Sequence, residues 1–119
     1  MGPEHTPLKI DGIDTDGGLK RLGGKRERYE QLLRKFAMRQ AGTVEDMRTA
    51  LASGDVATAE RDAHSLKGSA ATLGVDRVAE EARKAEAAIK SGNHISDALV
   101  SLSRSLDAVV MAIRAALPD

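Results

Sequence analysis

The feature that most constrains this chain is the spacing of its apolar residues, which recur three or four positions apart. Between residues 56 and 73 the steps are +3, +4, +3, +4 and +3, so the side chains share one narrow stripe of a helix. The spacing continues nearly everywhere after residue 13, whereas no segment combines period-two alternation with β-branched and aromatic residues. The pattern predicts an all-α protein. This stripe consists of Val56, Ala59, Ala63, Leu66, Ala70 and Leu73.

Glycines and capping residues divide the pattern into separate helices. Residues 16–22 predict a short first helix. The apolar residues between 29 and 51 keep one helical phase, but Gly42 lies within this stretch and lowers helix stability by about 1 kcal/mol relative to alanine. The pattern therefore predicts either one kinked helix or two shorter ones. Asp55 and Gly74 are typical of the two ends of the next helix, and two more stripes follow, over residues 75–89 and 95–117. Three or four long amphipathic helices with short links predict an antiparallel bundle.

Length and composition narrow the class of protein further. A chain of 119 residues suits one domain, and we expect it to span residues 12–119 after a flexible N-terminal tail over residues 1–11. Whether the first residues of that tail are native stays open. The 18 basic and 18 acidic side chains balance, which gives no electrostatic reason to expect nucleic acid or a membrane surface as partner. With no transmembrane run, no leader and no cysteine, a soluble cytoplasmic monomer is expected.

The stretch DAHSLKGSAATLG, residues 62–74, places a histidine on the face of its helix that points away from the core. At about 100° per residue, His64 lies roughly 140° from the centre of the apolar stripe, so a core histidine is disfavoured. An ordinary surface histidine remains an alternative. The residues around His64 on the exposed face are Ala57, Glu60, Arg61, Lys67, Gly68 and Ala71.

These neighbours suggest a chemical role for the ring. Gly68 lies one turn after His64, where a glycine costs helix stability, and close approach of another protein is a physical reason for it. Lys67 is a neighbour at i+3, and an ammonium group favours an imidazole that acquires negative charge, as it does when a phosphoryl group is added. Neutral imidazole is a nucleophile near neutral pH. We therefore interpret His64 as a phosphoryl acceptor that Lys67 assists.

Other kinds of site find no support in the sequence. The three histidines include no pair at i, i+4, and no acidic set has metal-ligand spacing, so no metal site is expected. The segment LGGKRE lacks the spacing of a nucleotide-binding glycine loop. Glu60 has two interpretations, a hydrogen bond to Nδ1 of His64 or a solvated charge, and the second is favoured.

The segment AHSLKGSAATLG resembles the signature of histidine phosphotransfer (HPt) domains, which reads His-x-x-Lys-Gly-Ser followed by Leu-Gly. The segments over residues 12–36 and 79–93 also look like the corresponding helices of that family, so the resemblance covers nearly the whole chain. It implies an antiparallel four-helix bundle with a short extra N-terminal helix. It also implies that His64 accepts the phosphoryl group through Nε2, that Lys67 lies against the phosphoryl oxygens, and that Gly68 clears space for a docking receiver domain.

The resemblance further implies a phosphocarrier that relays the group between receiver aspartates of response regulators and a hybrid sensor histidine kinase. No cofactor is expected on this domain, because the receiver brings Mg²⁺. Ser65 follows His64, where sensor kinases usually have an acidic residue, which fits a domain without autonomous kinase activity. Two alternatives stay open. One is the phosphoacceptor domain of a chemotaxis kinase, phosphorylated by an ATP-binding domain, and the other is a helical interaction module without chemistry.

Overall fold

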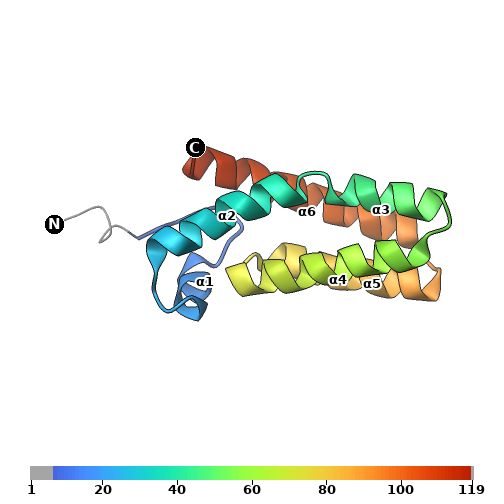
Figure 1. Ribbon diagram of the computed structural model, residues 1–119, viewed down its shortest axis with the longest axis horizontal. Helices are drawn as coiled ribbons and strands as arrows, with labels where there is room; N and C mark the ends of the chain where they lie inside the picture. Colours follow the sequence, from blue (N-terminus) through green and yellow to red (C-terminus); the bar gives the residue numbers. More distant parts are fainter. Residues whose placement is uncertain (1–6, 119) are drawn as a thin grey trace.

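The computed structural model describes residues 7–118, which form six α-helices and no β-strand. Four antiparallel arms run along the long axis: α2 and α3 follow one another as the first, and α4, α5 and α6 are the others (Figure 1). The predicted four-helix bundle with a short extra N-terminal helix is confirmed. The helices are α1 (Thr15–Arg21), α2 (Arg26–Gln40), α3 (Thr43–Ala52), α4 (Val56–Leu73), α5 (Asp76–Ser91) and α6 (Ile95–Ala116).

The region that the sequence left open consists of two helices rather than one kinked helix. α2 ends at Gln40, and Gly42 serves as the N-cap of α3 with φ −104° and ψ 7°, outside regular helical geometry. A break at glycine is reasonable, because glycine is a poor helix former. The two helices stay nearly in line, so together they form one side of the bundle (Figure 1).

The segment before α1 packs more closely than the sequence analysis expected. Ile10 is buried and Leu8 is partly buried against the core, although both fall in the expected tail over residues 1–11. The Thr15 hydroxyl donates to the backbone carbonyl of Leu8, which fixes this segment against the start of α1. Two isolated apolar residues carry no periodicity, so the sequence did not reveal their burial. Residues 1–6 of the expected tail lie outside the described residues.

Both ends of α4 are fixed by the residues that the sequence indicated. The Asp55 carboxylate accepts a hydrogen bond from the backbone N–H of Thr58 at 3.2 Å, as an N-cap does. Gly74 ends the helix at φ +82°, and its carbonyl accepts from the N–H of Asp14 at 2.8 Å. A Cβ at Gly74 would lie 2.2 Å from the Asp14 carbonyl oxygen, so only glycine fits where the chain crosses the end of α4.

The single tyrosine connects α2 to the same end of α4. Tyr29 is fully buried, and its hydroxyl donates to the backbone carbonyl of Leu73 at 2.6 Å. Gly18 of α1 lies against this pair, and a Cβ there would come within 2.5 Å of both the tyrosine Oη and the Leu73 carbonyl oxygen. This contact anchors α1, α2 and the C-terminal end of α4 to one another.

The interface between α4 and α5 is built from small side chains. Alanines of both helices are fully buried between them, among them Ala59, Ala63 and Ala70 of α4 and Ala82 and Ala85 of α5. Helices that meet through alanine can pack at the short end of the usual interaxial range. α5 is therefore held close to the helix that carries His64.

Replacing Tyr29 by phenylalanine tests the anchor at the end of α4. We expect Tyr29→Phe to lower the free energy of unfolding by about 1–2 kcal/mol, because it leaves a buried carbonyl unpaired. Burial, with the nearby Asp14 carboxylate, raises the pKa of Tyr29 from 10.0 to about 12. The folded state therefore retains this proton above pH 10.0, and the stability that it provides is lost as the pH rises toward 12. Urea denaturation of both proteins across this range should show their difference in stability shrinking, and a constant difference would contradict the assignment.

Candidate functional site

His64 lies on the solvent side of α4, as the sequence predicted. Its side chain is 67% exposed, whereas Ala63 and Leu66 on either side of it are fully buried. This position follows from the helical phase. Ala63 belongs to the buried stripe, and His64, the next residue, is turned about 100° away from it. The ring is thus accessible to a second protein without any movement of the bundle.

A buried carboxylate on the neighbouring helix holds one nitrogen of the ring. Oε2 of Glu86, on α5, lies 3.0 Å from Nδ1 of His64. The side chain of Glu86 is only 10% exposed, so the carboxylate projects from the edge of the α4–α5 interface toward the surface. The other ring nitrogen, Nε2, has no hydrogen-bond partner among residues 7–118.

The same carboxylate binds the lysine that the sequence singled out. Nζ of Lys67 donates to Oε1 of Glu86 at 2.8 Å, and Nζ of Lys90, one turn further along α5, lies 3.5 Å from Oε2. Lys67 is therefore held beside His64 by Glu86 rather than left free in solvent. One carboxylate faces two ammonium groups here, so the cluster carries an excess positive charge next to the ring.

These contacts decide the protonation state of the pair. The hydrogen bond from Lys67, helped by that from His64, lowers the pKa of Glu86 from 4.5 to about 2, against the opposing effect of burial. Glu86 is therefore ionised at neutral pH and can only accept hydrogen bonds. Nδ1 of His64 must then carry the proton, and in the neutral ring Nε2 keeps its lone pair. The accessible nitrogen is the nucleophilic one.

The space beside His64 is open. A Cβ added to Gly68 would meet no atom within 4 Å, so this glycine is not required by a close crossing of helices. Of the residues that the sequence placed around His64, Lys67 apart, four are exposed and one is half-buried. The exposed residues are Ala57, Arg61, Gly68 and Ala71, and the half-buried residue is Glu60.

Sequence reasoning missed the residue that orients the ring. Glu60 was the only carboxylate considered for Nδ1, but no hydrogen bond or ion pair joins it to His64 among the described residues. Glu86 takes that place, 22 residues further along the chain. The sequence offered one indication of this role. Glu86 directly follows Ala85, which belongs to the apolar stripe of α5, and a charged side chain beside a buried stripe needs a partner.

The structure is a helical bundle that presents one histidine to solvent in the middle of α4. The family model described as Hpt domain matches residues 31–116. The chain therefore belongs to the Hpt domain family, which confirms the resemblance seen in the sequence, and its function is phosphotransfer in a two-component phosphorelay.

A solved structure has the same fold. The chain is similar to the HPt domain of a hybrid sensor histidine kinase from Shewanella, with 24% sequence identity and a TM-score of 0.74. The match covers 87% of this chain and 92% of the other. At this level of identity the likeness concerns the fold. No curated protein sequence matches the chain.

The described residues, 7–118, contain neither a membrane-spanning helix nor a metal-binding cluster. No helix in this range has both the length and the apolar character that a bilayer span requires. Nor do these residues bring together three or more His, Cys, Asp or Glu side chains in a group that could hold a metal ion.

The buried carboxylate predicts a specific dependence of stability on acid. Glu86 stays ionised in the folded protein down to a pH of about 2, whereas its ordinary pKa is 4.5. Its contribution to stability is therefore complete above pH 4.5 and is lost as the pH falls toward 2. We expect Glu86→Gln to reduce the loss of stability across this range, measured by urea denaturation. Glu81→Gln is the matched control, because Glu81 lies on the same helix with a side chain 14% exposed, but its ion pair, to the exposed Arg77, is long at 3.9 Å. Equal acid dependence in all three proteins would show that Glu86 is not held as described.

Proposed function

We propose that His64 is the phosphoacceptor of this Hpt domain, taking the phosphoryl group on Nε2 from a receiver aspartyl phosphate and passing it to another receiver aspartate. The observation that carries the proposal is the contact between Nδ1 and the ionised Glu86 carboxylate, which leaves Nε2 as the unprotonated and unpartnered nitrogen. The exposed ring and the open space at Gly68 provide the access that such a transfer requires.

The transfer step balances with the groups present. The lone pair of Nε2 forms a bond to phosphorus while the bond from phosphorus to the aspartate oxygen breaks, and the carboxylate leaves with the electron pair. No proton has to move, because Nδ1 carries its hydrogen before and after the step. The ring gains positive charge as the bond forms, and the Glu86 carboxylate 3.0 Å from Nδ1 stabilises that charge.

Lys67 acts on the phosphoryl oxygens in this proposal. Its ammonium group uses one hydrogen for Glu86 at 2.8 Å and has two more to donate. The side chain is 33% exposed, so these hydrogens are open to the solvent side where the phosphoryl group arrives. Glu86 thus positions both the nucleophile and the cation from the neighbouring helix.

The chemistry proposed for His64 and Lys67 also indicates the partners of the domain. We propose receiver domains of response regulators and a hybrid sensor histidine kinase as partners, with Mg²⁺ supplied by the receiver and positioning and charge supplied by His64, Lys67 and Glu86. The domain would act as a cytoplasmic monomer. Ala57, Arg61, Gly68 and Ala71 would lie under the docked receiver, since they are exposed around His64, with half-buried Glu60 at the margin.

Transfer from a phosphorylated receiver tests the role of His64. Wild-type protein mixed with Mg²⁺ and a receiver labelled through ³²P-acetyl phosphate should take up label in an acid-labile, base-stable bond. His64→Gln should take up none, while its free energy of unfolding stays within about 0.5 kcal/mol of wild type, because the residue is exposed and the new amide can still donate to Glu86. Label retained in His64→Gln would place the phosphoryl group elsewhere. Label that enters only with an ATP-binding kinase domain, and never from a receiver, would favour the chemotaxis-type alternative.

The space at Gly68 is tested by filling it. Gly68→Gln should slow phosphoryl transfer at least about tenfold, because a side chain there stands between the ring and an approaching receiver. The same change should stabilise the helix by about 0.5 kcal/mol, since glutamine is the better helix former and meets no neighbour. Rates of transfer and denaturation curves measured on one preparation separate the two effects. A stabilised variant that transfers at the wild-type rate would refute the role given to Gly68.

A further inference from the structure

A groove runs between α2 and α4 on the same side of the bundle as His64. Its volume is about 500 Å³, and its apolar floor includes Leu32, Phe36 and Leu73. Gly68 lines the groove and also lies one helical turn from His64, so the groove adjoins the His64 site. A protein that covers His64 and extends toward α2 would therefore cover the groove as well.

The rim of the groove is basic. Lys35 and Arg39 of α2 are exposed there, and neither forms an ion pair or a side-chain hydrogen bond with any residue in 7–118. Elsewhere on α2, Arg26 and Arg34 share Glu30, at 2.8 Å and 4.0 Å. The two rim cations are therefore available to a partner.

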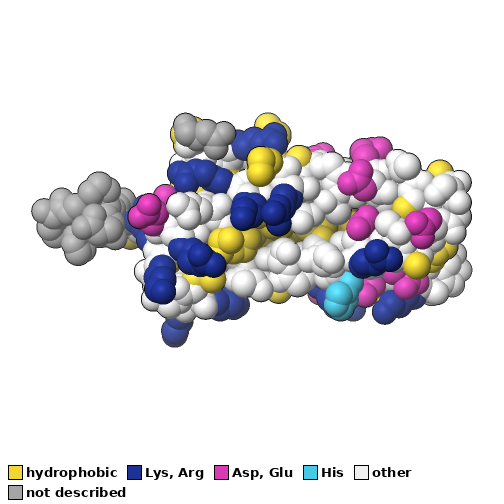
Figure 2. All heavy atoms as spheres, in the orientation of Figure 1, with side chains coloured by type: hydrophobic (Ala, Val, Ile, Leu, Met, Phe, Trp, Pro, Cys, Tyr) yellow, Lys and Arg dark blue, Asp and Glu magenta, His cyan; other side chains and the backbone are white. Residues whose placement is uncertain are grey.

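Charge is distributed unevenly along this face of the molecule. α2 carries five basic and two acidic side chains, whereas α3, the next part of the same arm, carries two acidic and one basic. Figure 2 shows Lys and Arg side chains over α2, hydrophobic side chains between α2 and α4, and Asp and Glu side chains over α3. On the α3 side, the Asp46 carboxylate adds to burial in raising the pKa of Asp62, so negative groups are also close together.

We propose that the groove between α2 and α4 docks a receiver domain whose contact surface presents an apolar side chain flanked by acidic residues, and that Lys35 and Arg39 select such receivers. The proposal rests on the function proposed for His64. It specifies in addition the kind of receiver that the domain binds and the orientation in which the receiver docks. The apolar floor takes the apolar side chain, and the rim cations pair with the acidic neighbours. A receiver turned end for end would place its acidic groups over α3, where like charges repel them.

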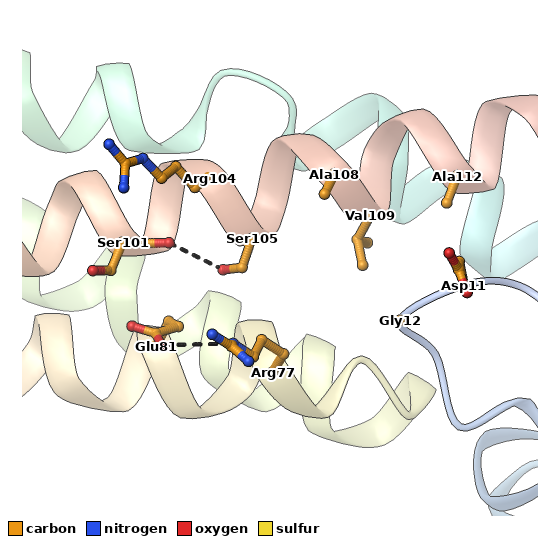
Figure 3. Close-up of a pocket in the computed structure, with 10 residues that line it drawn as sticks. All are labelled: Asp11, Gly12, Arg77, Glu81, Ser101, Arg104, Ser105, Ala108, Val109 and Ala112. Atoms are coloured by element: carbon orange, nitrogen blue, oxygen red, sulfur yellow. Dashed lines mark hydrogen bonds and ion pairs between the residues drawn. The ribbon is translucent and has the colours of Figure 1, made fainter.

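A second groove provides a matched control. It lies between α5, α6 and the N-terminal segment, has a volume of about 750 Å³, and is lined by Arg77 and Arg104 (Figure 3). Arg77 is within 3.9 Å of Glu81, but Arg104 is exposed without an ion pair among the described residues. Arg77 is nine residues before Glu86 on α5, which corresponds to about half a turn on the helical wheel, so this groove faces away from the site. Arg104→Glu thus makes the same change of charge at an exposed position outside the proposed interface.

The test measures docking separately from transfer. In a His64→Gln background, the Kd is measured for a panel of receiver domains from the same cell, each activated with beryllium fluoride and Mg²⁺. The receivers that bind should be those that present an apolar side chain flanked by acidic residues beside the aspartate pocket. Lys35→Glu and Arg39→Glu should each raise the Kd about tenfold, the double variant should raise it further, and the dependence on salt should weaken. Arg104→Glu should stay within about twofold of the parent.

The Kd values test the groove, whereas the label tests His64. A double variant that binds as the parent does, or an equal loss in Arg104→Glu, overturns the groove proposal while uptake of label by His64 leaves the proposed function intact. Label on another residue refutes the proposed function whatever the Kd values are. A panel in which no receiver binds the parent overturns the groove proposal, whereas the proposed function is decided by the label alone. Self-association that disappears in the double variant, seen by sedimentation, would assign the groove to a second copy of the chain and overturn the proposal.

Discussion

The Glu86 carboxylate is the constraint on which the site depends. It lies at the edge of the α4–α5 interface, with its side chain 10% exposed, and its two oxygens bind His64 and Lys67 at 3.0 Å and 2.8 Å. A charged group so placed is costly unless it is paired, and the histidine and lysine pair it. The arrangement therefore has two effects at once: it satisfies a buried charge, and it fixes the proton of the neutral imidazole on Nδ1, the nitrogen turned toward α5.

The fold makes this contact available because α4 and α5 lie close together. Fully buried alanines such as Ala63 and Ala82 let the two helices pack closely. The Glu86 side chain can therefore reach from α5 to the His64 ring on α4. The axial position of α4 is fixed at its C-terminal end by the Tyr29 hydroxyl and by the chain that crosses Gly74. Packing far from the histidine thus contributes to the geometry at the histidine.

Much of the fold was predictable because it depends on local periodicity. The stripe that begins at Val56, the cap at Asp55 and the glycine at position 74 gave α4 within one residue, and the same phase placed His64 on the exposed face. What the sequence did not give was the register between helices. Glu86 reaches His64 only through the relative rotation and offset of α4 and α5, which no spacing within one helix encodes. The burial of Ile10 and the groove against α2 depend in the same way on contacts between segments far apart in the chain.

A relay has to form and break the same bond with similar ease, and the geometry at His64 suits that requirement. A ring without a partner at Nδ1 would form a phosphoimidazole whose nitrogen is a poor leaving group until a proton arrives from solvent. In the proposed transfer the ionised Glu86 keeps the proton on Nδ1, so the ring would enter the reaction as a neutral nucleophile and leave it as a neutral imidazole. The excess positive charge from Lys67 and Lys90 would then favour an anionic phosphoryl group beside the ring. In the proposed relay the receivers set the direction of transfer, and the charge along α2 and α3 would select which of them reach the ring.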